Sequence, residues 1–379
     1  MNKKIYFDNA ATSWPKPYYT INAVKEYFQG DGGGINRSNS HFSIEELRNC
    51  LKEYLGFNDK YEVAFVPSAT IGMNIVINYF AEKNIKVLTT NMEHHCVYRP
   101  LNEYKVNYKI ARVLQSDCKV EENIMLKELD EDTGGVIINH ASNVVGAIFN
   151  YEKIASKIPK NVITVLDVSQ TVGIEELNFK ESQIDILVGG THKHLYGLQG
   201  LGFIVFKKEI GLKPIYYGGT GMKSNIMFQP RIYPEWLEAG TYNSIALLVL
   251  KECINARNNE VRLREKQYEK QLLHYMCERL NNMEGIRLYM GEQDKRTSVV
   301  SFNVKNLDPT YVVGEYLKQK GIQVRTGLHC APLVHDAINT RDTGTVRVSF
   351  SYINTIGEID YFVLQLKNLL REMKCLNIH

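Results

Sequence analysis

Between residues 63 and 206, short runs of consecutive apolar residues alternate with longer segments of helical spacing. Apolar runs without polar alternation are typical of strands buried on both faces of a parallel sheet. Helices are expected over Gly72–Glu82 and Glu152–Ile158. The expected strands are Val63–Val66, Ile85–Thr89, Val136–Asn139, Val162–Asp167, Asp185–Val188 and Phe203–Phe206. The alternation predicts an α/β fold in which helices cover a mostly parallel central sheet.

The pattern changes near residue 243. Residues 244–282 are highly charged with helical spacing, and we expect one long helix or two there. An α+β pattern follows, with strands over Ser298–Val304, Ile322–Arg325 and Thr345–Ser351 and helices over Thr310–Lys320 and Glu358–Glu372. A chain of 379 residues is long enough for two domains. We predict a large domain at residues 16–255 and a small domain formed by residues 1–15 and 256–379.

Composition excludes several classes of function. With 45 Lys and Arg against 42 Asp and Glu, and without a long basic run, the chain is not expected to bind nucleic acid or an anionic membrane. It has neither an 18-residue apolar run nor an apolar segment after its N-terminal lysines, so we expect a cytoplasmic protein. Seven scattered cysteines without a Cys-x-x-Cys pair indicate neither a disulfide framework nor a zinc site.

Two segments that follow strands have the chemistry of a ligand site. In PSATIGMN, Ser68, Ala69 and Thr70 begin a helix, where free N–H groups bind an anion such as phosphate; Ser or Thr can equally be a plain N-cap. In VLDVSQTVG, Asp167 closes an apolar strand, with Gln170 three residues later. Ligands bind at this edge of α/β sheets. Asp167 would either pair with a protonated ring nitrogen or cap a helix.

Lys193 lies in the Gly-rich, nearly uncharged segment GGTHKHLYGLQGLGF. Desolvation lowers the pKa of a lysine and makes its neutral amine available for a Schiff base. The alternative is a surface lysine in a loop. A phosphate-binding helix start, a carboxylate at a strand end and a desolvated lysine are together what pyridoxal phosphate requires.

The chain resembles class V aminotransferase-fold enzymes, and within them the cysteine desulfurases and selenocysteine lyases. The resemblance implies a pyridoxal-phosphate-dependent transferase fold like that of aspartate aminotransferase. The similar stretches keep the order of the family and are YFDNAATSWPKP (6–17), MEHHCVYRPL (92–101), HASNVVG (140–146), DVSQTVG (167–173), THKHLYGLQG (191–200), LEAGTYN (237–243), VRTGLHCAPL (324–333) and VRVSFSYINTIGEID (346–360).

The resemblance implies a role for each cofactor-binding residue. Lys193 would form the Schiff base, Asp167 would pair with the ring nitrogen, and Gln170 would contact the ring hydroxyl. His94 would stack on the ring and move protons. The remaining implied contacts are with the phosphate, from Ala69, Thr70 and His192, and with the phosphate of a neighbouring subunit, from Thr241. The last contact implies a homodimer with shared sites.

For the substrate, the resemblance implies that Arg347 binds the carboxylate, that Arg325 lies nearby, and that Asn143 lies beside substrate and ring. From the residues alone, a surface ion pair is the alternative for both arginines.

Cys330 lies in VRTGLHCAPLVHD (324–336), which Gly327 and Pro332 indicate to be a loop. From the residues alone, this thiol is a nucleophile, a metal ligand or a space-filling side chain. The resemblance implies that it carries a persulfide. The attacking form is the thiolate, which positive charge on Arg325, His329 or His335 would favour. The short spacing from Cys330 to Arg347 is similar to the branch that contains sulfur-mobilisation desulfurases and selenocysteine lyases.

The implied activity is conversion of L-cysteine to L-alanine, with the sulfur passed from Cys330 to an acceptor. That acceptor would be an iron–sulfur cluster scaffold, a tRNA-thiolation protein, a cofactor-biosynthesis enzyme or a small thiol. Alternatives are a selenocysteine lyase, another class V aminotransferase or epimerase in which Cys330 is a bystander, and a non-catalytic protein that binds partners.

Two stretches depart from the family pattern. The order Gly190-Thr191-His192-Lys193 moves a hydroxyl one place from where relatives have it, which puts one phosphate contact in question. Ile71 and Gly72 stand where relatives have Thr and Glu. His194, next to the lysine, is expected to face solvent.

Overall fold

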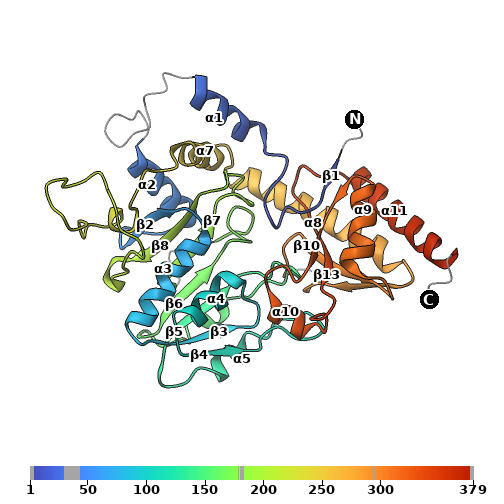
Figure 1. Cartoon of the computed structure of the whole chain (residues 1–379), viewed down its shortest axis with the longest axis horizontal. Helices are drawn as coiled ribbons and strands as arrows, with labels where there is room; N and C mark the ends of the chain where they lie inside the picture. Colours follow the sequence, from blue (N-terminus) through green and yellow to red (C-terminus); the bar gives the residue numbers. More distant parts are fainter. Residues whose placement is uncertain (1–3, 30–42, 178, 180–182, 293–294, 376–379) are drawn as a thin grey trace.

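The computed structural model describes residues 4–29, 43–177, 179, 183–292 and 295–375 (Figure 1). Its larger part, here called the large region, is built on a seven-stranded sheet. In spatial order the strands are β2 (Tyr61–Val66), β8 (Gly202–Lys207), β7 (Ile186–Gly190), β6 (Ile163–Asp167), β5 (Thr133–Asn139), β3 (Lys86–Thr90) and β4 (Tyr108–Ala111). Strand β8 runs antiparallel to both of its neighbours, and the other pairs are parallel. The predicted α/β fold with a mostly parallel sheet is confirmed.

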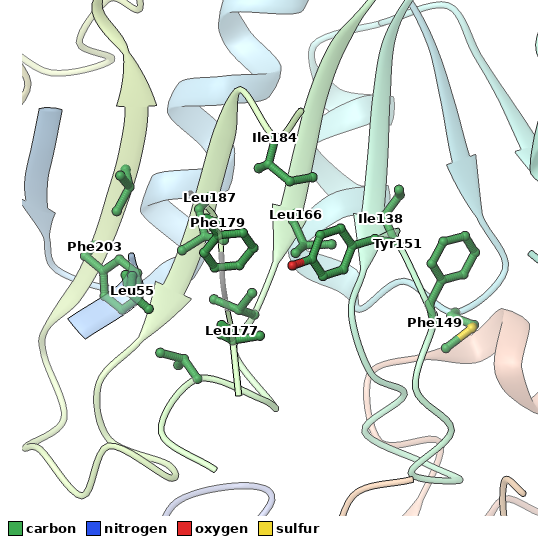
Figure 2. Close-up of a cluster of buried hydrophobic side chains, with 14 of the residues drawn as sticks. Leu55, Ile138, Phe149, Tyr151, Leu166, Leu177, Phe179, Ile184, Leu187 and Phe203 are labelled. Atoms are coloured by element: carbon green, nitrogen blue, oxygen red, sulfur yellow. The ribbon is translucent and has the colours of Figure 1, made fainter. Parts of the chain in front are cut away.

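Both faces of this sheet are buried, which explains the continuous apolar runs. In β5, Val136 and Ile138 pack with one cluster, and Ile137 packs with the cluster on the opposite face. The first cluster includes α2 (Ile44–Leu55), α6 (Glu152–Ala155) and α7 (Ser244–Asn255), and the second includes α3 (Ala69–Glu82) and α4 (His95–Glu103). Figure 2 shows the first cluster, where aromatic rings meet strand side chains such as Leu166 and Leu187.

Two further helices belong to the large region. Helix α1 (Tyr18–Gln29) packs on α7, and α5 (Asn123–Lys127) precedes β5. Two 3₁₀ turns lie at Lys208–Ile210 and Glu235–Leu237.

A four-stranded antiparallel sheet forms the core of the second part, here called the small region. Its strands, in spatial order, are β12 (Arg325–Gly327), β13 (Thr345–Ser349), β10 (Val299–Val304) and β9 (Ile286–Tyr289). Helices α8 (Asn259–Asn281) and α11 (Ile356–Cys375) pack on this sheet. The remaining helices are a π-helical turn at Pro309–Gly314, α9 (Glu315–Gln319) and α10 (Pro332–Ala337).

The N-terminal segment belongs spatially to the small region. Strand β1 (Ile5–Tyr6) pairs in parallel with β11 (Ile322–Gln323), and in Figure 1 it lies among the orange and red elements. Phe7 is fully buried with its ring edge-on to Phe350 and Phe362. The division of the chain at residues 15/16 and 255/256 stays a prediction.

Several local predictions were wrong in detail. The expected strand Ile322–Arg325 is split between β11 and β12, which belong to different sheets. Strands β4 and β9 were missed because both are partly exposed, which weakens the apolar signal. By contrast, the expectation of one long helix or two over residues 244–282 is confirmed, because two helices form there, separated at Ala256–Asn258. The expected loop 324–336 is a turn at 328–331 between β12 and α10, since Pro332 fits the first turn of a helix.

Within the described ranges, no helix is both long enough and apolar enough to cross a bilayer.

Candidate active site

Polar side chains from both regions converge on one pocket. It lies where β5, β6 and β7 end and where α3 and α4 begin, and the small region closes its other side. Of the twelve predicted site residues, ten line this pocket: Ala69, Thr70, His94, Asn143, Asp167, Gln170, His192, Lys193, Arg325 and Arg347. The carboxyl ends of parallel strands share one sheet edge, which explains why segments far apart in sequence meet here.

The start of α3 offers backbone donors to an anion. Ser68 caps the helix, because its Oγ accepts a hydrogen bond from the Ile71 N–H at 3.3 Å. The N–H groups of Ala69 and Thr70 belong to the first turn, which has no intrahelical acceptors. A Cβ on Gly202 would lie 2.6 Å from the Ala69 nitrogen, so glycine is required for β8 to approach the helix start. Ser68 is therefore a plain N-cap, and the free N–H donors belong to the residues that follow it.

Asp167 is buried at the end of β6 with both carboxylate oxygens in contact with donors. Oδ1 accepts from the Ser169 N–H at 2.8 Å, and the Cys96 thiol lies 3.6 Å from Oδ2. Burial raises the pKa of Cys96 well above its usual value, so this sulfur is a neutral donor. The bond to Ser169 closes a local turn, and Asp167 and Cys96 both line the pocket.

Lys193 lines the pocket, and burial lowers the pKa of its amine, with Asp167 opposing that shift. Its neighbouring peptides are fixed from two directions. The His192 carbonyl accepts hydrogen bonds from Ser13 N–H at 3.1 Å and Lys16 Nζ at 2.9 Å. The carbonyl on the other side, that of His194, accepts from Arg257 Nη1 at 2.5 Å.

The structure shows where the side chains of Thr191 and His194, close to this lysine, are directed. Thr191 is fully buried and its hydroxyl donates to the carbonyls of Leu198 and Leu201, so it is directed away from the pocket. The prediction that His194 faces solvent is wrong. Its side chain is buried with Nε2 3.6 Å from a carboxylate oxygen of Glu269, on α8.

His94 has a structural role that also fixes its protonation. It is the N-cap of α4, and its Nδ1 accepts a hydrogen bond from the Cys96 N–H at 3.1 Å. Burial, followed by the nearby Lys193, lowers its pKa to about 3. The ring is therefore neutral near pH 7, with its proton on Nε2, because Nδ1 is an acceptor. His94 can donate one hydrogen bond into the pocket.

Six lining side chains carry polar atoms without a partner among the described residues: Gln170 Oε1, Asn143 Oδ1, His192 Nδ1, Ser169 Oγ, His329 Nδ1 and Arg347 Nε. The side-chain amide nitrogens of Gln170 and Asn143 already have acceptors. Gln170 donates to Ala10 O at 3.1 Å, and Asn143 donates to His329 O at 2.7 Å. Buried polar atoms are normally paired. These atoms fit a polar ligand in the pocket.

The small region contributes two arginines that face each other across neighbouring strands. Arg325 on β12 and Arg347 on β13 are directly opposite in register. Arg325 Nη2 lies 3.6 Å from Cys330 Sγ. Arg347 is fully buried; it donates from Nη1 to Asn143 O at 2.9 Å and from Nη2 to Asp8 Oδ1 at 2.6 Å.

Cys330 is half-buried in the turn between β12 and α10, next to the lining residue His329. Both have a left-handed backbone, with φ of 50° at His329 and 58° at Cys330. The turn is held to the large region by two bonds, from Asn143 Nδ2 to His329 O and from His95 N–H to Cys330 O at 2.8 Å.

The expectation that His329 and His335 supply positive charge near Cys330 is wrong. Burial lowers the pKa of His329 well below its usual value, with Arg347 adding to the effect. Burial and Arg341 lower the pKa of His335 to about 4. Both rings are neutral near pH 7, which leaves Arg325 as the positive group in contact with Sγ.

Thr241 lies apart from this pocket. It is exposed and lines a different depression with Pro67, Gly200 and Tyr216. The sequence predicted that Thr241 contacts the phosphate of a neighbouring subunit, and this role stays a prediction.

Sequence reasoning missed Asp8, Cys96 and Asn139. Cys96 and Asn139 line the pocket, and Asp8 pairs with Arg347. Asp8 and Cys96 lie inside stretches that resemble the family, YFDNAATSWPKP and MEHHCVYRPL, so position in a motif was the available signal. Among the residues the structure covers, no group of three or more His, Cys, Asp or Glu side chains has the arrangement of a metal site.

Comparison with known proteins decides the family. The aminotransferase class-V family model matches residues 5–362. The chain belongs to this family. A probable cysteine desulfurase from Borreliella burgdorferi is 28% identical, and the match covers 98% of this chain and 94% of that protein. A probable cysteine desulfurase from Pyrococcus abyssi is 29% identical, covering 98% and 95%.

Solved structures agree with the sequence comparison. The apo structure of a cysteine desulfurase from Thermococcus onnurineus matches with a TM-score of 0.85 and 27% identity, covering 98% of this chain and 96% of that one. The predicted resemblance to class V enzymes is confirmed, and so is the pyridoxal-phosphate-dependent transferase fold.

Proposed function

We propose that this class V family member is a pyridoxal-phosphate-dependent cysteine desulfurase. The observation that carries the proposal is the meeting of three groups from distant parts of the chain. Lys193 and Asp167 line the same pocket, and Cys330 contacts Arg325 at its rim. Relatives of similar length over nearly the whole chain are named cysteine desulfurases.

The pocket residues fit the cofactor. Asp167 would face its ring nitrogen and Lys193 would bind it covalently. The donors at the start of α3 and His192 would hold its phosphate, and the unpartnered Gln170 Oε1 would accept from its hydroxyl. When bound, pyridoxal phosphate supplies an electron sink that loosens bonds at the substrate Cα and Cβ.

Side chains of this protein bind the substrate and accept its proton. Arg347 binds the substrate carboxylate, as guanidinium geometry allows. Lys193 Nζ accepts the proton from the substrate Cα, because its lowered pKa favours the neutral amine. His94, neutral and able to donate from Nε2, would lie against the cofactor ring. Asn143 lies between the substrate and the Cys330 turn.

Cys330 then takes the sulfur. Its thiolate attacks the substrate sulfur, forming an S–S bond while the substrate Cβ–S bond breaks. The electron pair of the broken bond stays with the substrate, which is protonated and leaves as L-alanine. The sum is one thiol plus L-cysteine giving one persulfide plus L-alanine. Arg325 is placed to pair with the thiolate.

The proposal is tested by sulfide and alanine release from L-cysteine in the presence of a reducing thiol. Native protein is expected to release both in equal amounts. Cys330→Ser should keep the visible absorbance of bound cofactor and lose sulfide release. Cys375→Ser is the matched control, because Cys375 is exposed near the C-terminus, and it should behave as native. A Cys330→Ser variant that keeps the native rate would contradict the proposal.

We infer two kinds of partner for this activity. A second copy of the chain would bring Thr241 to the neighbouring phosphate, and an acceptor thiol would take the sulfur from Cys330. The segment 217–228 carries large exposed apolar side chains, including Met227 and Phe228, which suits an interface. A reducing compartment, the cytoplasm, suits a chain whose cysteines are all free.

A further inference from the structure

Asp8 has a position that its sequence context did not reveal. It follows β1, forms an isolated bridge with Ser349, and places its carboxylate 2.6 Å from Arg347 Nη2. Asp8 is outside the set of residues that line the pocket, whereas Arg347 belongs to that set. Its side chain is 13% exposed, and the arginine is 1% exposed.

The two opposed arginines create a need for negative charge. Like charges directly opposite on neighbouring strands repel each other. Arg325 and Arg347 occupy such positions, and Arg347 is buried. A buried guanidinium without a counter-ion is strongly destabilising. Asp8 supplies one permanent negative charge to this pair of positive charges.

Arg347 has more N–H groups than its hydrogen bonds to the described residues use. A guanidinium has five N–H groups. Asp8 takes one from Nη2 and the Asn143 carbonyl takes one from Nη1. Nε is buried and has no partner in the described part of the chain. The group is thus fixed at two corners and still has donors for a further acceptor.

We propose that Asp8 is a positioning residue for carboxylate recognition: it is the fixed counter-ion that holds Arg347 so that its remaining donors bind the carboxylate of the amino-acid substrate. The proposal rests on the assignment of Arg347 under the proposed function. It adds that the net charge of the Arg325, Arg347 and Asp8 group is +1, which matches a ligand with one carboxylate.

The test compares two ligands that differ by the carboxylate alone, L-alanine and ethylamine. Both bind through the amine, so their dissociation constants are measured on the protein loaded with pyridoxal phosphate, from the change in its visible absorbance. For Asp8→Asn we expect the dissociation constant of L-alanine to rise about tenfold, because a charge-assisted bond that orients Arg347 is lost. The constant for ethylamine should not change.

Asp185→Asn is the matched control. Asp185 pairs with Lys207 at the same distance, 2.6 Å, is 17% exposed, and lies away from the pocket. It should leave both constants at the native value. Asp8→Glu keeps the charge and should keep most of the preference for L-alanine. The ratio of the two constants does not depend on the folded fraction, so partial unfolding of Asp8→Asn does not hide the result.

KM and kcat for L-cysteine give the second readout. Asp8→Asn should raise KM about as much as the L-alanine constant and change kcat less. An equal rise in the dissociation constants of both ligands, or a lower constant for L-alanine, would overturn the role of Asp8. Arg347→Met separates this failure from a wrong assignment of Arg347. If that variant binds L-alanine like the native protein, the carboxylate site itself is misplaced.

Discussion

The two sides of the pocket are built in different ways. On the large region, Asp167 and Lys193 follow the ends of buried parallel strands, and His94 caps a helix. On the small region, Cys330 lies in a turn with two successive left-handed residues, held by bonds to His329 O and Cys330 O. Non-glycine residues in that conformation persist when their surroundings fix them. Strand ends fix the cofactor side, whereas polar contacts of the turn and the buried side chains of Ala331 and Val334 that follow it fix the side that carries the thiol.

This difference suits the two tasks. Groups that hold a cofactor gain from a fixed geometry. A nucleophile that accepts sulfur in the pocket and delivers it elsewhere has to move. The predictions below test whether the two sides respond differently to substitution.

The largest effect is expected from Lys193→Ala. Loss of the base that we propose acts at the substrate Cα should lower the rate of alanine formation by about 10³-fold. The melting temperature should not fall, because the substitution removes a desolvated amine. Alanine assays and thermal unfolding check the two statements. A loss of activity that follows a loss of folded protein would show that the lysine also supports the fold.

Gly173→Ala should show how tightly the cofactor side is packed. Gly173 has φ of 98°, and a Cβ there would overlap the His194 carbonyl next to Lys193. We expect a loss of about 4 kcal/mol in the free energy of unfolding from overlap and strain together. Gly211→Ala is the control, since Gly211 has φ of 76° but open space around it, and it should cost about 1 kcal/mol. Urea unfolding gives both values; equal losses would mean that packing beside Lys193 is loose.

Glu93→Gln tests a buried carboxyl beneath the cofactor side. Burial raises the pKa of Glu93 to about 8, above its usual 4.5. The folded protein therefore holds a proton between these pH values that the unfolded chain releases, and stability falls as pH rises through this window. Glutamine has no such proton. The variant should gain on the order of 2 kcal/mol over native protein between pH 5 and pH 8. A difference that is constant with pH would contradict the shift.

The smallest effect is expected from Asn143→Ala, which removes a bond that holds the Cys330 turn. Losing the 2.7 Å bond to His329 O should cost about 1 kcal/mol and raise the alkylation rate of Cys330 several-fold. Mass spectrometry of the Cys330 peptide measures that rate separately from the other thiols. Asn303→Ala is matched, since Asn303 also donates to a backbone carbonyl, that of Gly344 at 3.0 Å. It should leave the Cys330 rate unchanged.

The sequence located residues at strand ends better than contacts between distant segments, for a physical reason. Asp167 and Lys193 were found because apolar strands end beside them, and strand ends share one edge. The burial of His194 depends on Glu269, far along the chain on another element, and local pattern carries no such information. The pairing of β1 with β11 and the register of Arg325 with Arg347 are equally long-range.

Local rules also failed where a side chain found an unexpected acceptor. The displaced hydroxyl of Thr191 put one phosphate contact in question, and the structure shows this hydroxyl bonded instead to carbonyls of the following turn. His329 and His335 were considered as cations, and burial makes them neutral. Both outcomes depend on depth in the fold, which one sequence does not reveal.

The ion pair between Asp8 and Arg347 joins residues separated by 339 positions. During synthesis, the segment that contains Asp8 leaves the ribosome long before β13 exists. Domains fold as their chains emerge, so the large region can form early while residues 5–8 wait for strands made much later. A nascent chain consequently lacks the contact between Asp8 and Arg347 until nearly the whole chain has been translated.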